Sequence, residues 1–157
     1  MIHKDLRGIK FDTILPPGYY FRNFRDGDID IWVDIEKASG EFVTIKDAIK
    51  RFRDEFDDLK EELESRCFFL CNEIGEPVGT AMGWFGDLHG EKLGRLHWIS
   101  IKPEYQGRRL GKPLVAKAME RIQKSHDKAY LTSQTTSWRA INMYLDFGFQ
   151  PLYIYDN

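Results

Sequence analysis

Residues 96–115 combine the start of a helix with a preceding loop and strand, in a spacing that could bind an anionic group. A β-branched and aromatic run before Pro103 favours a buried strand that ends at the proline. Gly107 and Gly111 lie in the loop, and apolar residues recur after Gly111 at helical spacing. Free backbone amides and the helix dipole both favour negative charge at such a place. Three cationic side chains, Arg108, Arg109 and Lys112, add to this, so we expect a phosphate-bearing cofactor here.

Three kinds of anion-binding loop can be compared with this segment. A nucleotide-binding P-loop ends in Gly-Lys followed by Ser or Thr, whereas here Pro113 replaces the magnesium-binding hydroxyl and the segment is one residue short. A dinucleotide loop needs a third glycine besides Gly107 and Gly111. The pyrophosphate loop of acetyl-CoA-dependent transferases begins with Arg or Gln and ends on a small residue five positions later. Gln106 and Gly111 fit that pattern.

Length, charge and cysteine content limit the class of protein. The 157 residues suffice for one domain with a substantial core, and we predict a single domain over residues 1–157 with a loose lead-in at 1–15. A net charge of −2 and the absence of a long apolar run argue against nucleic acid or a membrane as partner. Cys67 and Cys71 lie too far apart on a predicted strand to bridge, which favours reduced thiols, a cytoplasmic location and no metal site.

Two helices are predicted in the first part of the chain, after a strand at residues 19–24. Asp28 can cap the first helix, which ends at Gly40. The second begins at Thr44, and its apolar stripe continues to Leu63. A single helix of about 20 residues would be roughly 30 Å long.

Strand signals then dominate up to the central loop. Residues 67–71 and 77–85 form a predicted hairpin. A polar loop from Gly86 to Gly94 leads into the strand before Pro103, so three successive strands should be antiparallel. Residues 129–132 favour a further short strand after the central helix.

The last part of the chain favours a helix and a strand. Thr136 or Ser137 can cap this helix, Gly148 ends it, and residues 149–155 favour a final strand. The predicted architecture is therefore one α/β domain, with a mixed, mostly antiparallel sheet flanked by about four helices.

Two segments, residues 101–108 and 137–149, carry motifs of a known family. The first, IKPEYQGR, is similar to the signature VxPxxQGxG, and the second, SWRAINMYLDFGF, is similar to the helix and strand pattern AxxxYxxxGF. Both belong to the GNAT superfamily of acetyl-CoA-dependent N-acetyltransferases, which the chain resembles from about Tyr19 to Phe149. The resemblance implies a GNAT-like fold and acetyl-CoA as cofactor.

Three features depart from the family pattern. Arg109 stands where a glycine is usual, so either its backbone is strained or altered, or its guanidinium adds a phosphate contact. Ser137 replaces an asparagine that reaches the cofactor in many relatives. Eight residues follow Phe149, so the last hairpin of the family is reduced to one strand.

The resemblance also implies how the cofactor is held. Backbone amides from Gln106 to Gly111 would hold its pyrophosphate, and its pantetheine arm would fit a gap between the central strand and residues 129–133. The acetyl carbonyl would lie at Ser100 and Ile101, where a main-chain amide would polarise it. The residues assigned to the cofactor in this way are Ser100, Ile101, Gln106, Gly107, Arg108, Arg109, Leu110, Gly111, Lys112, Ser137 and Asn142.

Two residues are candidates for acid and base catalysis within the resemblance. His97 lies on the central strand where some relatives place a working histidine, and histidine titrates near the operating pH. Tyr144, in the second motif, is the candidate acid that protonates the leaving thiolate. Asp87 and His89, in the predicted loop, are alternative bases.

We therefore expect an N-acetyltransferase that moves an acetyl group from acetyl-CoA to a primary amine by direct attack in a ternary complex. The alternatives are a transferase for another acyl-CoA and a non-catalytic acyl-CoA-binding module. The expected acceptor is a small-molecule or peptide amine, and Trp84 and Phe85 favour an aromatic or apolar one. A homodimer is also expected, because a second copy could complete the pairing of the last strand.

Overall fold

The computed structural model describes residues 1–132 and 137–152. Within these ranges, six strands form one sheet in the order β1-β6-β5-β4-β3-β2. Their bounds are β1 Ile2–His3, β2 Tyr20–Asn23, β3 Cys67–Cys71, β4 Pro77–Leu88, β5 Glu91–Ile101 and β6 Ala129–Tyr130. The β5–β6 pair is parallel and the others are antiparallel, which confirms the predicted mixed sheet.

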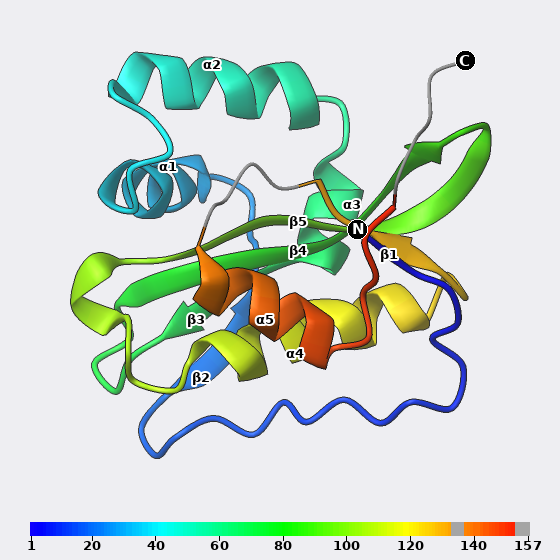
Figure 1. Cartoon of the computed structure of the whole chain (residues 1–157). Coiled ribbons are helices and arrows are strands. Elements are labelled where there is room, and N and C mark those ends of the chain that lie inside the picture. Colours follow the sequence, from blue (N-terminus) through cyan, green and yellow to red (C-terminus); the bar gives the residue numbers. More distant parts are fainter. Residues whose placement is uncertain (133–136, 153–157) are drawn as a thin grey trace.

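Five α-helices flank the sheet in the described residues, one more than predicted. They are α1 Ile29–Ala38, α2 Ile45–Phe56, α3 Lys60–Arg66, α4 Gly111–Gln123 and α5 Trp138–Asp146, and a short 3-10 helix spans Pro103–Tyr105. Figure 1 shows α1 and α2 on one face of the sheet and α4 and α5 on the other. None of these helices has the length and apolar character needed to cross a lipid bilayer.

Two hydrophobic clusters hold the helices to opposite faces of the sheet. In the cluster between α4 and the sheet, α4 contributes Leu114, Val115, Ala118, Met119 and Ile122. Under α1 and α2, the helices contribute Trp32, Ile35, Ala48, Phe52 and Phe56, and the sheet contributes Phe69, Met82 and Trp84. Each large side chain that is fully buried adds about 1.5–3 kcal/mol of hydrophobic stabilisation.

The backbone of α4 lies unusually close to the sheet at Gly83. A Cβ atom at this position would lie 2.6 Å from the carbonyl oxygen of Ala118. Glycine therefore allows α4, and the loop in front of it, to sit directly against β4.

The predicted single helix over residues 44–63 is wrong, because the chain turns between α2 and α3. Thr44 does cap α2, since its hydroxyl accepts from the amide of Asp47 at 3.1 Å. The turn follows Phe56, whose carbonyl accepts from the amide of Leu59 at 2.9 Å. Two consecutive aspartates are poor helix formers, and β3 begins directly after Arg66, so the chain must bend toward the sheet here.

The predicted loop from Gly86 to Gly94 is instead the tip of a long hairpin. Strands β4 and β5 stay paired as far as Leu88 and Glu91. The two turn residues, His89 and Gly90, have φ values of 51° and 82°. Positive φ at both central positions is the turn geometry that fits the twist of a two-residue hairpin.

Both ends of the chain also differ from the prediction. The lead-in is not loose throughout, because β1 pairs with β6 and Leu6 is fully buried. The backbone amide of Leu6 donates to the backbone carbonyl of Asp127 at 2.7 Å. At the other end, Gln150 forms an isolated bridge with Ile2 rather than beginning a described strand. The expected strand over 149–155 lies partly outside the described residues, and β6 is shorter than the predicted 129–132.

Candidate active site

A bulge in β5 and a short β6 open the sheet at one place. Met82 pairs with His97 and Thr80 pairs with Ser100, so two residues of β5 oppose one of β4. Within the bulge Trp98 has a φ of 48°. Strand β6 pairs with β5 at Gly94 and Arg95 and with no later described residue of β5. The strands therefore separate beside the bulge, where the resemblance implied a gap for the pantetheine arm.

Two cavities meet at this opening. The larger, about 1030 Å³, lies between the loop before α4 and the helix α5, and we call it the loop cavity. The smaller, about 720 Å³, is lined by Glu41, by Arg51 of α2 and by residues of β5, and we call it the α2 cavity. The residues that line both cavities are Ile99, Ser100, Ala140 and Tyr144.

The loop cavity contains ten of the eleven residues assigned to the cofactor from the sequence. They are Ser100, Ile101, Gln106, Gly107, Arg109, Leu110, Gly111, Lys112, Ser137 and Asn142. Arg108 does not line it, although its guanidinium lies over the ring of Tyr105, 4.8 Å from the centroid, and Tyr105 does line the cavity. Arg108 is thus the one member of the set that lies beside the cavity without lining it.

The backbone of the loop has the properties of an anion site. Among the described residues, the amides from Gly107 to Gly111 donate no hydrogen bond. The side chain of Gln106 donates to the carbonyl of Ile101 at 3.0 Å and so fixes the loop to the end of β5. Lys112 contributes positive charge, although Asp146 lies 3.5 Å from its Nζ. Unpaired amides at the start of α4 fit a diphosphate-bearing cofactor.

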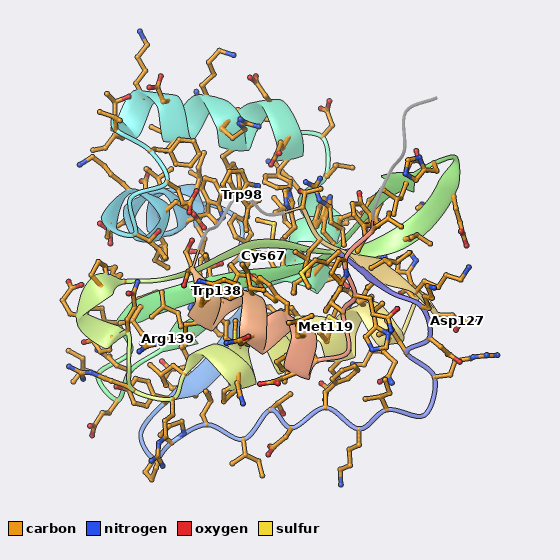
Figure 2. The ribbon with its side chains drawn as sticks, in the orientation of Figure 1. Cys67, Trp98, Met119, Asp127, Trp138 and Arg139 are labelled. Atoms are coloured by element: carbon orange, nitrogen blue, oxygen red, sulfur yellow. The ribbon has the colours of Figure 1, made fainter. Side chains whose placement is uncertain are left out.

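His97 lies in the α2 cavity and faces Glu55 of α2. The His97 Nε2 is 3.5 Å from Glu55 Oε2, and the indole N–H of Trp98 donates to the same oxygen at 2.7 Å. The bulge thus turns two consecutive side chains toward one carboxylate. Figure 2 shows Trp98 between the sheet and the α1–α2 layer.

Burial sets the charge state of this pair. Desolvation lowers the pKa of His97 below its usual 6.5, although the hydrogen bond with Glu55 opposes the shift. Desolvation alone would raise the pKa of Glu55, but the hydrogen bonds from His97 and Trp98 outweigh it and leave that pKa lowered. His97 is therefore a neutral imidazole at pH 7, next to an ionised carboxylate.

Tyr144 lies on α5 at the junction of the cavities. Of the two predicted caps, Ser137 caps this helix, with its hydroxyl accepting from the amide of Ala140 at 3.4 Å, and Thr136 lies outside the described residues. The ring of Tyr144 packs edge-on against Phe149, and burial raises the pKa of its phenol. A protonated phenol therefore faces both cavities at neutral pH.

Residues 30–149 match the model of the acetyltransferase (GNAT) family. The chain belongs to the GNAT acetyltransferase family. It is 28% identical over 142 residues to the mycothiol acetyltransferase of Streptomyces griseus. The matched region covers 88% of this chain and 45% of that protein. The chain thus spans less than half the length of the curated relatives that it matches.

Solved structures of low identity share the fold. A GCN5-related N-acetyltransferase from Sphaerobacter thermophilus superposes with a TM-score of 0.69 at 16% identity, covering 94% of this chain and 46% of that one. An aminoglycoside N-acetyltransferase in complex with CoA superposes with a TM-score of 0.65 at 14% identity, covering 92% and 99%. These comparisons establish a GNAT fold for this chain.

Arg109 occupies a left-handed backbone conformation, with a φ of 63°, at the position where GNAT sequences usually carry glycine. The loop has thus kept the conformation that glycine favours, at a backbone strain of about 1–2 kcal/mol. Arg109 also lines the loop cavity, so a phosphate contact from its side chain is compatible with this position. Both alternatives raised by the sequence, backbone strain and a phosphate contact, remain compatible with this position.

Two substitutions at Arg109 separate the backbone from the charge. We expect R109G to be more stable than R109A by about 1 kcal/mol, because both lose the guanidinium but only alanine retains the left-handed strain. Urea unfolding measures this difference. If the guanidinium contacts phosphate, both variants bind CoA more weakly than the wild type by calorimetry and to the same extent. Equal stability of R109G and R109A would contradict the strain.

Sequence analysis missed Glu36, which lies on α1 and is fully buried. Its Oε2 accepts from the hydroxyl of Ser100 at 2.8 Å, and its Oε1 has no hydrogen-bond partner in the described residues. Burial raises the pKa of this carboxyl to about 8. No local signal distinguishes Glu36 from a solvent-facing helix residue, since its partner lies on β5.

The raised pKa of Glu36 predicts a pH-dependent stability. The unfolded carboxyl has a pKa of about 4.3 and the folded one about 8, so unfolding releases a proton between these values. The wild type should lose up to about 1.4 kcal/mol of unfolding free energy per pH unit in this window, whereas E36Q should not. Urea unfolding at pH 5 and pH 8 measures the effect. An equal difference between E36Q and wild type at both pH values would contradict it.

The other candidates lie away from both cavities. Asp87 and His89 are exposed near the tip of the β4–β5 hairpin and line neither cavity, so the structure does not bring these two alternative bases to this site. Trp84 is buried against Phe56, and neither it nor Phe85 lines either cavity, which removes the argument for an aromatic acceptor from these two residues.

Proposed function

We propose that this chain transfers an acetyl group from acetyl-CoA to a primary amine, by direct attack within a ternary complex. The observation that carries the proposal is the meeting of the two cavities at Ser100 and Tyr144. One cavity offers unpaired amides for a diphosphate, and the other holds a neutral histidine. Membership of the GNAT family supports acetyl transfer in general.

The loop cavity binds and orients the cofactor. Amides from Gly107 to Gly111 bind the diphosphate, with Arg109 and Lys112 beside it. Acetyl-CoA supplies an activated acetyl thioester when it is bound. A main-chain amide at Ser100 or Ile101 polarises the acetyl carbonyl, and a donor of this kind is typically worth ~10²–10³ in rate.

The α2 cavity receives the amine. A lysine-like ammonium has a pKa near ~10.4, so its deprotonation at pH 7 requires roughly 4–5 kcal/mol. His97, neutral at this pH, accepts that proton, and Glu55 stabilises the imidazolium that forms. Glu41, which also lines this cavity, adds negative charge that attracts a cationic acceptor.

Tyr144 then donates its phenolic proton to the departing thiolate. Since a thiol pKa of ~8.5 already makes the thiolate a fair leaving group, this proton accelerates departure without being indispensable.

The two cysteines support direct transfer. Cys67 and Cys71 are free and buried, and neither lines the loop cavity or the α2 cavity. Burial raises the pKa of the Cys67 thiol to about 12, so it is not a thiolate at neutral pH. Detection of an acetylated cysteine by mass spectrometry after incubation with acetyl-CoA would contradict the ternary-complex mechanism.

A thiol-release assay separates this proposal from its alternatives. Acetyl-, propionyl- and succinyl-CoA are each incubated with polyamines, aminoglycosides, amino acid derivatives and peptide amines, and free CoA is measured. We expect amine-dependent release that is fastest with acetyl-CoA. CoA binding by calorimetry without release from any donor and amine would instead favour a non-catalytic module.

A further inference from the structure

The proposed reaction must remove two protons from nitrogen. An ammonium group carries three protons and the amide formed from a primary amine carries one. His97 can accept only one of the two, and it is the one histidine among the described residues that line the α2 cavity. Glu41 also lines this cavity, but it is exposed to solvent. A second proton acceptor next to the reacting nitrogen would therefore be useful.

We propose that Ser100 and Glu36 form a second proton path at the junction of the cavities, a proposal that rests on the proposed function. As the nitrogen–hydrogen bond breaks, the proton passes to Ser100 Oγ, and the original hydroxyl proton of Ser100 passes to Glu36 Oε2. The serine hydroxyl is restored, the electron pair stays on nitrogen, and Glu36 becomes a neutral acid. In this path Ser100 contacts the substrate, and Glu36 is a positioning residue that acts through it.

The geometry of the pair supports this path. Ser100 lines both cavities, so it lies next to any atoms that react between them. Its hydroxyl already donates to Glu36 Oε2 at 2.8 Å, which is the direction that the relay requires. The carboxyl is fully buried, and the one hydrogen bond that its oxygens make with described residues is the bond from Ser100, which connects it to the cavities.

The fold holds Glu36 in place near the end of α1. Its carbonyl accepts from the Ser39 hydroxyl and the Glu41 amide, each at 3.0 Å. Its Oε1 has no described partner, so only the bond to Ser100 orients the carboxyl. A buried carboxyl with an unused oxygen is unfavourable for stability alone.

The electrostatic surroundings suit a group that gains and loses a proton near neutral pH. Burial raises the pKa of Glu36 to about 8, the hydrogen bond from Ser100 opposes the shift, and Glu41 adds to it. The Cys67 thiol of β3 interacts electrostatically with Glu36, and its own pKa of about 12 keeps it neutral. Within the described residues, the side chains that shift the pKa of Glu36 are therefore Ser100 and Glu41, and no residue of α2 or β4 contributes.

The ratio of wild-type kcat to E36Q kcat between pH 6 and pH 9 tests the path. Below the pKa of Glu36 its carboxylate is scarce, so we expect a ratio near 1 at pH 6 that rises to about 10 or more above pH 8. Titration of the amine affects both enzymes and cancels in the ratio. S100A should give the same profile, and the double variant should be no slower than either single variant.

A matched control and a second readout complete the test. E64Q removes an exposed carboxylate on α3 and should give a ratio of 1 at every pH. Without substrates, difference infrared spectroscopy against E36Q should follow the ionisation of Glu36, and S100A should raise its pKa. A kcat ratio that does not change with pH, or a Glu36 pKa that does not change in S100A, overturns the proton path and leaves the proposed function unaffected. Absence of turnover by the wild type overturns both the proposed function and this path.

Discussion

Y144F lowers kcat by about 100-fold and changes the KM for acetyl-CoA by less than about threefold. The phenol sits at the junction of the cavities, and its raised pKa keeps it protonated, so its proton is available when the thiolate leaves. Removing a general acid typically costs 10²–10⁴ in rate, and the low end applies because a thiolate is already a fair leaving group. Steady-state thiol release at pH 7 measures both constants.

The substitution leaves the ring in place, so the effect should be separable from folding. The edge-on contact with Phe149 survives in Y144F, and we expect an unchanged midpoint of urea unfolding. Y20F, on the edge strand β2 at the far side of the sheet, is the matched control and should keep wild-type kcat. A kcat for Y144F within threefold of the wild type would show that Tyr144 is not the acid.

H97Q lowers kcat/KM for the amine by about 10–100-fold at pH 7 and removes the acidic limb of the pH profile. Because burial lowers the pKa of His97, the wild-type limb lies below pH 6.5, where the imidazole becomes protonated and cannot accept a proton. The pH dependence of kcat/KM from pH 5 to pH 8 measures this limb. It is separate from the change near pH 8 assigned to Glu36.

Glu55 adjusts this limb through its bond to His97. The carboxylate raises the pKa of the imidazole, so E55Q should move the limb to lower pH. H126Q is the control, since His126 contacts Arg66 outside both cavities and also has a pKa lowered by burial. An acidic limb that persists unchanged in H97Q would contradict the assignment of His97 as base.

The sequence was sufficient where the local pattern and the tertiary structure agree. The helix after Gly111, the Ser137 cap and the hairpin of β3 and β4 follow from periodicity and turn residues. At Arg109 the sequence left a strained backbone and a phosphate contact as alternatives, and its φ of 63° lies in the left-handed region that glycine favours. In these cases, neighbours in sequence decide the conformation.

The sequence was insufficient where contacts distant in sequence decide the structure. The lead-in is held by contacts with residues more than 100 positions away, such as the pairing of β1 with β6 and the bond from the amide of Leu6 to the carbonyl of Asp127. The bulge that turns His97 and Trp98 toward Glu55 depends on the register between β4 and β5, which periodicity does not fix. Glu36 looks like an ordinary helix residue until α1 packs against Ser100, 64 residues later in the chain.

Following a labelled acetyl group from donor to acceptor shows whether this chain transfers acetyl to an amine. The chain is incubated with acetyl-CoA labelled in the acetyl group and the amines that support thiol release, and products are identified by mass spectrometry. We predict that the label appears on the acceptor nitrogen in an amount equal to the CoA released, and that Y144F lowers both rates together. Release of CoA without label on any amine would contradict acetyl transfer at this site.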